Sequence, residues 1–505
     1  MSTMKKISLI SFFALTLFFT GCEDYIENDV TGKQTLDSYY SNFDECDKAI
    51  IGCYASLSPE DWWQMDFFWM VGDICSDDAF KGNNNEGDQR DFGNLADFNI
   101  TPANEWLEIK WRYTYQGIYR TNLAIENIPG APIDEEQIRT FVAEAKFLRA
   151  VHYFELVKNW GAVPLLLEPL SVSDAKLERT PEDQIWAQID SDFQEAAQAL
   201  PSKSSLSAQN MGRATKGAAL AYLAKSALYQ KKYQEAYNYA QEVENLGDYN
   251  LSDAFENVWS IHNANGNGSI FEIQHSYNDL FYSGSALPVL SRSRADGGWG
   301  FTTPSSHLDN FMGDDPRRVH TIIRQGEYVD EEHPSYDTNP SENMSGRINK
   351  KYYLAMADRP EKDEYIRSGL NHILLRFADL LLMKAEAAFQ NGNEAEAMAL
   401  VNRVRERAGA DLISLSGPDL LNAIYDERRL ELAMEGHRYY DLKRTGRLAE
   451  AMQEFLTYNL STNTDPYDAG NDEGKFFNPA LHYLFPVPQT EIDLSGGLIT
   501  QNPGY

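Results

Sequence analysis

Residues 227–236, Ala227-Leu-Tyr-Gln-Lys-Lys-Tyr-Gln-Glu-Ala236, and residues 388–397, Ala388-Phe-Gln-Asn-Gly-Asn-Glu-Ala-Glu-Ala397, share one layout. Each stretch places a small residue at the end of one predicted helix, then a tight turn, then an alanine nine residues further on in a second helix. Small residues at these points let two helices approach closely. Each stretch therefore predicts a tightly packed helix pair.

This layout is typical of tetratricopeptide-type helix pairs, which repeat about every 34 residues. The two copies are 161 residues apart, so a large insertion must separate them. The region 248–370 has the texture of that insertion: Gly-rich turns, several prolines, and short strand-like runs at 270–274 and 321–324. The region 58–104 is similar. The pattern predicts a mainly α scaffold with a large, loop-rich α+β capping subdomain.

The clearest single helix is predicted at 135–160. Ile138, Phe141, Ala145 and Leu148 fall on one face of it. Gly161 and a proline at position 164 end the helix, and residues 163–167 are predicted to form a short strand.

The N-terminus has the three parts of a bacterial lipoprotein signal peptide. Lys5 and Lys6 are followed by an uncharged apolar run that is too short to span a membrane, and then by small residues before Cys22. We expect residues 1–21 to be removed and Cys22 to carry the lipid; an ordinary secretory signal is the alternative. Residues 22–34 are acidic and polar and are predicted to be a tether to a single domain at 35–505.

The charge of the chain argues against nucleic acid as a partner. The formal net charge is −32, so the surface repels phosphates and suits a neutral ligand better than an anionic one. Aromatic residues make up 12 % of the chain, and sugar-binding surfaces use such rings. Cys46 and Cys53 are seven residues apart in a predicted helix, a rise of about 10 Å that is too long for a disulfide. Together with Cys75 they are predicted to be buried, apolar thiols.

Motifs of catalysis and cofactor binding are missing from the sequence. It contains no phosphate-binding glycine loop, no His-Glu-x-x-His and no Gly-x-Ser-x-Gly. His437 is predicted to be a structural histidine. Asp77 and Asp78, beside Phe80, invite comparison with a glycosidase pair, but adjacent carboxylates point in different directions. We therefore predict no catalytic residue, no metal ligand and no cofactor, although scattered oxygen ligands for a metal ion leave no spacing signature.

Blocks along nearly the whole chain resemble the SusD/RagB family of Bacteroidetes outer-membrane lipoproteins, in the order in which that family has them. The matching blocks are Glu144-Ala-Lys-Phe-Leu-Arg-Ala150 through Trp160-Gly161, the 213–243 hairpin, Gly298-Trp299-Gly300-Phe301, Leu375-Arg376-Phe-Ala-Asp-Leu-Leu-Leu-Met-Lys-Ala385-Glu386, Glu427-Arg428-Arg-Leu-Glu431-Leu-Ala-Met-Glu435-Gly436-His437-Arg438, and Phe485-Pro486-Val-Pro488 to Tyr505. The acidic residues that follow Cys22 also resemble the signal that sends such lipoproteins to the cell surface.

The resemblance implies about four tetratricopeptide-type helix pairs capped by an irregular subdomain. It also implies a function: a non-enzymatic protein, lipid-anchored on the outer face of the outer membrane, that binds glycans and acts as a lid on a SusC-like TonB-dependent transporter. Two alternatives stay open. The same scaffold can capture peptides or another nutrient, and a lipid-anchored glycosidase is the third class.

Charged residues recur in the matching blocks beside apolar stripes. Glu144 and Arg149 form one such group; the other consists of Glu427, Arg428, Glu431 and Arg438. We predict that they form buried ion pairs that orient helix packing, which makes these blocks scaffold. The ligand site should then lie in the loops.

Two loop regions and one block carry the flat rings and short polar side chains that a sugar site needs. The first region, residues 77–92, supplies the candidate ligand-binding residues Asp77, Asp78, Phe80, Lys81, Asn83, Asn84, Asp88 and Arg90. The second supplies Tyr277, Asn278, Phe281 and Tyr282, and the matching block adds Trp299. For the first region the alternative is a solvated turn, and for the second it is local packing. For Trp299 the alternative is packing within the scaffold. Trp62, Trp63 and Trp69 form another aromatic cluster, for which core packing is expected of most.

Overall fold

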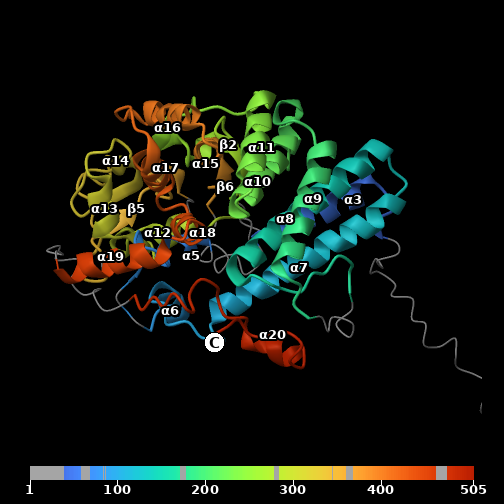
Figure 1. Cartoon of the computed structure of the whole chain (residues 1–505), viewed down its shortest axis with the longest axis horizontal. Coiled ribbons are helices and arrows are strands. Elements are labelled where there is room, and N and C mark those ends of the chain that lie inside the picture. Colours follow the sequence, from blue (N-terminus) through green and yellow to red (C-terminus); the bar gives the residue numbers. More distant parts are fainter. Residues whose placement is uncertain are drawn as a thin grey trace, which may run out of the picture.

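A row of packed helices forms the scaffold of the protein (Figure 1). The computed structural model describes residues 39–58, 69–83, 85, 87–170, 178–277, 284–343, 345–359, 368–461 and 475–505. The scaffold helices are α3 (Phe43–Ala55), α7 (Glu105–Asn127), α8 (Glu135–Trp160), α9 (Glu182–Ala199), α10 (Lys216–Tyr229), α11 (Tyr233–Leu246), α15 (Phe377–Gln390), α16 (Glu394–Ala408) and α17 (Gly417–Leu432). Neighbours pack as α3–α7, α8–α9, α10–α11 and α15–α16, with α17 against the last pair. The predicted set of helix pairs is confirmed.

The two look-alike stretches form the pairs α10–α11 and α15–α16. Ala227, Ala236, Ala388 and Ala397 are all buried where the paired helices meet. The chain leaves the first pair at the end of α11 and returns with α15, so the predicted interruption between the two pairs is also confirmed.

Helix α8 begins and ends close to the predicted positions. A capping box between Asp134 and Gln137 satisfies its first amides, and Gly161 follows its last turn. The strand predicted at 163–167 is wrong, because only Val163 makes a bridge, to Thr180. Side chains of α7 and α8 take the place of a partner strand: the Tyr153 hydroxyl donates to the Leu166 carbonyl at 2.8 Å and accepts from the Leu166 amide at 2.6 Å.

Within the described residues, three small antiparallel sheets organise the predicted insertions and join them to the scaffold. The strands are β1 (Ala79–Gly82), β2 (Ser269–Ile273), β3 (Phe301–Pro304), β4 (Ile322–Arg324), β5 (Arg347–Asn349) and β6 (His372–Arg376). They pair as β1–β3, β2–β6 and β4–β5. The β1–β3 pair brings the region 58–104 against the region 248–370, and β2–β6 leads directly into α15. The runs predicted at 270–274 and 321–324 correspond to β2 and β4.

Further helices, most of them short, lie in the connections. They are α5 (Val71–Ile74), α6 (Arg90–Ala96), α12 (Leu287–Ser291), α13 (Ser306–Met312), α14 (Arg318–Thr321), α18 (Arg438–Arg444), α19 (Leu448–Ser461) and α20 (Gln489–Leu494), with single 3-10 turns η1 (Ile128–Gly130), η2 (Lys203–Ser205), η3 (Ala208–Asn210), η4 (Phe255–Asn257), η5 (Ile261–Asn263), η6 (Arg294–Asp296) and η7 (Met356–Asp358). Among the described residues, no helix has both the length and the apolar character to cross a membrane.

Several predictions concern the N-terminal part of the chain. Cys46, Cys53 and Cys75 are buried free thiols, as expected. Trp69 is partly buried against the core, whereas Trp62 and Trp63 lie outside the described residues. The signal peptide 1–21, Cys22 and the tether 22–34 also lie outside them, so these assignments stay predictions.

Two backbone segments touch where α5 meets the loop before α18. A Cβ atom placed on Gly72 would lie 1.8 Å from the Gly436 carbonyl oxygen. Both carboxylate oxygens of Asp73 accept the Gly436 amide at 3.0 Å, which fixes this approach. The contact ties the 58–104 region to the C-terminal end of α17.

We expect Gly72→Ala to lower the free energy of unfolding by about 2–3 kcal/mol, because the added methyl meets backbone that no side-chain rotation can clear. Gly52→Ala is the matched control. Gly52 lies inside α3 with open space around its Cβ position, so this change should stabilise the protein by about 0.5–1 kcal/mol. Urea titration of both variants measures the difference; equal stabilities would show that the backbone contact is absent in solution.

Candidate functional site

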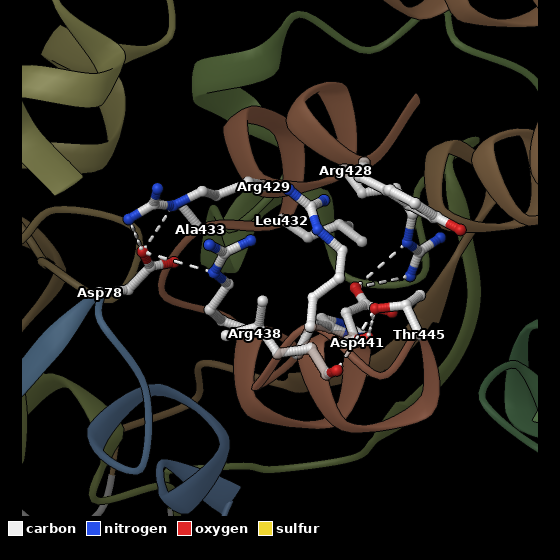
Figure 2. A pocket seen from close by; sticks show the side chains of 12 residues that line it. Asp78, Arg428, Arg429, Leu432, Ala433, Arg438, Asp441 and Thr445 are labelled. Atoms are coloured by element: carbon white, nitrogen blue, oxygen red, sulfur yellow. Dashed lines mark hydrogen bonds and ion pairs between the residues drawn. The ribbon is translucent and has the colours of Figure 1, made fainter. Parts of the chain in front are cut away.

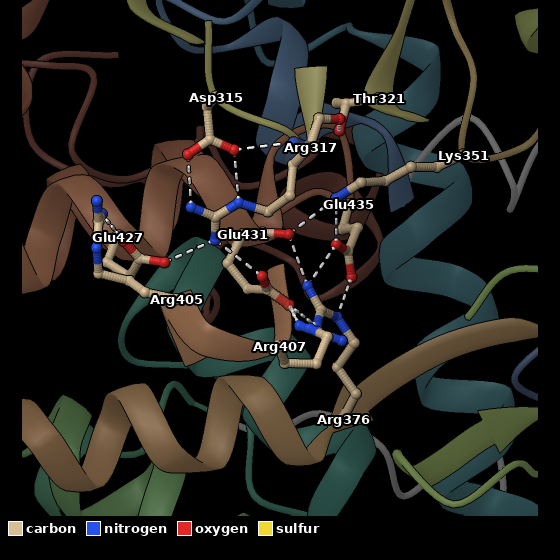
Figure 3. A network of polar contacts seen from close by, with 10 residues as sticks. All are labelled: Asp315, Arg317, Thr321, Lys351, Arg376, Arg405, Arg407, Glu427, Glu431 and Glu435. Atoms are coloured by element: carbon tan, nitrogen blue, oxygen red, sulfur yellow. Dashed lines mark hydrogen bonds and ion pairs between the residues drawn. The ribbon is translucent and has the colours of Figure 1, made fainter. Parts of the chain in front are cut away.

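The charged residues of the last helical block form a buried network that anchors the insertion to the scaffold (Figure 3). Glu431 on α17 accepts from Arg376 at 2.5 Å and Arg317 at 3.0 Å, and it also pairs with Arg407. Glu427 binds Arg317 at 2.6 Å and Arg405 at 2.7 Å. Because Arg317 comes from the insertion, these carboxylates act as structural anchors, as predicted.

The remaining predicted scaffold charges are paired as well. Arg149 on α8 forms a two-point ion pair with Asp192 on α9, both contacts at 2.8 Å. Glu144 accepts from the Tyr54 hydroxyl at 2.7 Å and from Arg213 at 3.2 Å, which joins α3 and the segment before α10 to α8. The prediction of buried ion pairs is confirmed for both groups.

Asp441 on α18 gives this scaffold a pH dependence that can be measured. Burial alone raises its pKa, but Arg428 and Arg444 outweigh burial and lower the pKa to about 2. A carboxylate with a depressed pKa stabilises the fold above its ordinary value of 3.8 and loses that contribution as the pH falls toward 2.

We therefore expect wild-type protein to lose about 2 kcal/mol from this residue between pH 5 and pH 2. Asp441→Asn should be less stable at pH 7 and should show a shallower decline in acid. Asp419→Asn, an exposed carboxylate on α17, is the control and should follow wild type. Urea midpoints measured across this pH range test the prediction. If the midpoints of Asp441→Asn and wild type fall in parallel with pH, the pKa of Asp441 is not lowered in the folded protein.

Asp77 and Asp78 lie in the interior rather than on a ligand-facing loop, which corrects the picture of them as surface residues. Arg438 holds both oxygens of Asp77 at 2.8 and 2.9 Å, and Arg429 binds Asp78 at 2.8 Å. Figure 2 shows Arg429 and Arg438 around Asp78 on one side of a cavity of about 20 Å³, which has room for water but not for a sugar. Burial raises the pKa of Asp77, but Arg429 and Arg438 bring it below its ordinary value, the reverse of what a general acid needs.

The next residues of the predicted region shape its loop from within. Phe80 is buried against Phe455, with ring centroids 5.9 Å apart. The Lys81 ammonium donates to the carbonyls of Asn85 at 2.9 Å and Asp88 at 3.1 Å. The buried Asn83 amide donates to Asp88 Oδ2 at 2.5 Å. These three side chains therefore hold the loop in shape; Asn84 lies outside the described residues.

The structure brings the predicted loop and the predicted tryptophan together. Arg294 donates to Asp88 Oδ2 at 2.5 Å and, through Nε, to the Trp299 carbonyl at 3.2 Å. Gly82 permits this meeting, because a Cβ there would lie 2.3 Å from the Gly300 carbonyl oxygen. We call the surface formed by Asn85, Asp88, Arg90, Arg294 and Trp299 the loop junction.

The loop junction offers a mixed polar and aromatic surface. Asn85 and Arg90 are exposed, Asp88 and Arg294 are about one-third exposed, and Trp299 is half-buried against the core. Trp299 is fixed by its amide, which donates to the Val289 carbonyl at 2.8 Å. Trp299 meets the loop through its backbone carbonyl, which accepts from Arg294, so donors, acceptors and an aromatic residue occur together here, as a ligand rich in hydroxyl groups needs.

Tyr277 is the described member of the second predicted region, since Asn278, Phe281 and Tyr282 lie outside the described residues. Tyr277 is 42 % exposed and follows two residues after His275. His275 lines a cavity of about 360 Å³ between α3 and the end of β2, together with Ile51, Tyr54 and Gln274. Tyr277 is therefore two residues along the chain from His275, which lines this largely apolar cavity.

Sequence reasoning missed Arg294, the residue that links both halves of the loop junction. The sequence marks Arg294 only as a basic residue close to the glycines that precede Trp299. Pairing with Asp88 spans 206 positions of the chain, and no local pattern reports such a partner.

Among the described residues, no group of three or more His, Cys, Asp or Glu side chains is arranged to hold a metal ion. Burial, with Lys225 nearby, lowers the pKa of His437 to about 4, so this histidine is neutral at pH 7. It borders an interior cavity of about 40 Å³ together with Glu155 and Lys158, which fits ordered water.

Comparison with known proteins now gives the family. The model of the SusD family matches residues 234–505, and a model described as starch-binding associating with outer membrane matches residues 66–228. The chain belongs to the SusD family. SusD-like protein P2 of Formosa agariphila is 29 % identical to it over 552 aligned positions, which cover 99 % of this chain and 100 % of that protein.

Solved structures agree with this family and with the helical scaffold. A laminarin-binding SusD-like protein is 29 % identical, with a TM-score of 0.77, and covers 92 % of this chain and 100 % of its own. Surface glycan-binding protein A from Bacteroides fluxus is 25 % identical, with a TM-score of 0.78 and the same coverage. The SusD-type helical scaffold and the likeness to surface glycan-binding proteins are thus established.

Proposed function

We propose that this SusD-family chain is a cell-surface lipoprotein that captures an oligo- or polysaccharide at the loop junction and delivers it to a SusC-like TonB-dependent transporter. The observation that carries the proposal is the meeting of the 81–92 loop with the Arg294–Trp299 turn. Two insertions, far apart in the sequence, converge there on one exposed surface, while the matching helical blocks are used for scaffold contacts.

The chemistry of the loop junction supports a neutral sugar. Arg90 and Arg294 supply donors, Asn85 and Asp88 supply acceptors, and Trp299 supplies a ring for the C–H face of a pyranose. The net charge of −32 disfavours an anionic ligand. Because the surface is shallow, we expect modest affinity.

Anchoring and delivery follow from the N-terminal sequence and from the family. Lipid on Cys22 would tether the body to the outer membrane, and the acidic residues behind it favour the outer face. The chain then needs no catalytic centre, and the burial of Asp77 and Asp78 beside arginines supports a binding role over a glycosidase. A lid on a transporter barrel is the role that this family assignment favours.

Laminarin is the first ligand to test, because the relative at 29 % identity is described as laminarin-binding. Affinity electrophoresis of the mature protein in gels that contain laminarin, starch or other polysaccharides should show retardation by at least one of them. Incubation of the protein with the same glycans should release no hydrolysis products. Retardation by none, together with binding in a peptide panel, would overturn the glycan proposal in favour of peptide cargo.

A further inference from the structure

A separate cavity in the insertion is lined for a polyhydroxylated ligand. Its volume is about 270 Å³, and its walls come from the η4–η5 turns, the 329–330 loop and residues 350–358. The polar residues of its lining that the proposal uses are Glu256, Asn257, Ser260, Asp330, Lys350 and Asp358. None of them belongs to the loop junction. We call this space the insertion cavity.

Residues that carry donors and residues that carry acceptors both line the insertion cavity. The Lys350 ammonium gives one hydrogen bond to the Val319 carbonyl at 2.9 Å and has further N–H groups. The Ser260 hydroxyl accepts the His262 amide at 3.2 Å and keeps its own proton to donate. Asp358 Oδ1 is paired with His262 at 2.9 Å, and both Asp330 oxygens are held, Oδ1 by His333 at 2.9 Å and Oδ2 by the Tyr353 hydroxyl at 2.7 Å, so these carboxylates bring partly engaged acceptors to the lining. A sugar hydroxyl both donates and accepts, so this lining matches it better than a lining of one kind.

Three exposed apolar residues are chain neighbours of residues that line the insertion cavity. Tyr328 is 65 % exposed, Met356 49 % and Val319 45 %, and each is the chain neighbour of a residue that lines the cavity.

The floor of the insertion cavity is rigid. The Lys351 ammonium lies 4.3 Å from the Trp259 ring centroid and is bound to Glu435 at 2.6 Å, within the buried network of Figure 3. A preformed wall of this kind costs a ligand less ordering on binding.

A second network connects the insertion cavity to the loop junction. Asp296, two residues after Arg294, is held by Arg359 through two contacts of 2.7 Å and by His333 at 3.2 Å. His333 also binds Asp330, whose carboxylate lines the insertion cavity, at 2.9 Å. The two surfaces therefore sit on one hydrogen-bonded framework.

We propose that the insertion cavity is a second carbohydrate-binding site, which takes one sugar residue of a neutral glycan. This proposal takes only the class of ligand, a glycan, from the function proposed above. The residues of the insertion cavity are different from those of the loop junction. The acidic lining, with Asp330, Asp358 and Glu256 against Lys350, disfavours an anionic ligand here as well.

Hydroxyl-radical footprinting of the whole mature protein, with and without laminarihexaose, tests this proposal. Tyr328 and Met356 are oxidisable and should be protected by the sugar, and Trp299 should be protected at the loop junction. Lys350→Met keeps the length of the side chain but removes its donors, so protection of Tyr328 and Met356 should be lost while that of Trp299 stays. Lys48→Met, on the exposed face of α3, should leave both footprints unchanged.

The outcomes separate the two proposals. Protection of Trp299 alone overturns the second site and leaves the loop junction in place. Protection of Tyr328 and Met356 in both wild type and Trp299→Ala, without protection of Trp299 in wild type, supports the second site and overturns the first. Protection at neither place overturns both for this glycan.

Discussion

Glu431→Gln is expected to lower the free energy of unfolding by about 3–5 kcal/mol, the loss typical of a buried charge network that loses one partner. Glu431 is fully buried and faces Arg317, Arg376 and Arg407. Burial raises its pKa, yet the three guanidinium groups hold the pKa well below its ordinary value, so the carboxylate is charged at neutral pH. Glutamine keeps the shape of the side chain but leaves the three cations with less compensation.

The loss should be visible beyond α17, because Glu431 binds residues of both the insertion and the scaffold. Arg317 comes from the insertion, and Arg376 ends β6 directly before α15. We therefore expect Glu431→Gln to loosen the insertion first, which hydrogen exchange of β4 and β5 would report as faster than that of α8.

Glu195→Gln is the matched control. Glu195 on α9 pairs with Lys146 on α8, but its side chain is 52 % exposed, so the change should cost less than about 1 kcal/mol. Guanidinium denaturation of the two variants gives the comparison. If both lose the same small amount, the buried network does not anchor the insertion.

Trp299→Ala is expected to weaken glycan binding about tenfold, which corresponds to about 1.4 kcal/mol. The proposed site sets the ring against a sugar face at the loop junction, and alanine removes that contact while the backbone bond to Val289 stays available. Isothermal titration with laminarihexaose measures the change.

Two further variants separate stacking from packing, since Trp299 also contacts the core. Trp299→Phe keeps a flat ring and should retain most of the affinity. Tyr119→Ala removes a ring on α7 that is 46 % exposed and should bind as wild type does. If Trp299→Phe loses as much affinity as Trp299→Ala, while thermal unfolding shows both destabilised, the role of Trp299 is structural.

Local pattern was enough to predict the scaffold. The alanines at 227, 236, 388 and 397 report close helix packing directly, because helix pairing depends on residues a fixed number of positions apart. The interruption between the two pairs could also be predicted, because the distance between the two stretches along the chain is far longer than one repeat. The predicted strand at 163–167 failed because the hydrogen bonds that satisfy its backbone come from side chains such as Tyr153.

Long-range partners were the part that the sequence did not reveal. Asp77 and Asp78 lie in a polar stretch and were expected on a loop surface. They are buried instead, where they form ion pairs with Arg429 and Arg438, about 350 positions later in the chain. The same kind of pairing makes the loop junction. Asp88 and Trp299 were both predicted as ligand residues, but their proximity depends on Arg294 and on the β1–β3 register.

We propose that a glycan binds where the 81–92 loop meets the Arg294–Trp299 turn. A crystal structure of the mature protein soaked with laminarihexaose, or with whichever glycan retards it in a gel, would locate the bound sugar. We predict ordered sugar within hydrogen-bond distance of Asp88 and Arg294, with a pyranose ring against Trp299. Sugar ordered elsewhere on the protein, with the loop junction empty, would show that the glycan does not bind there.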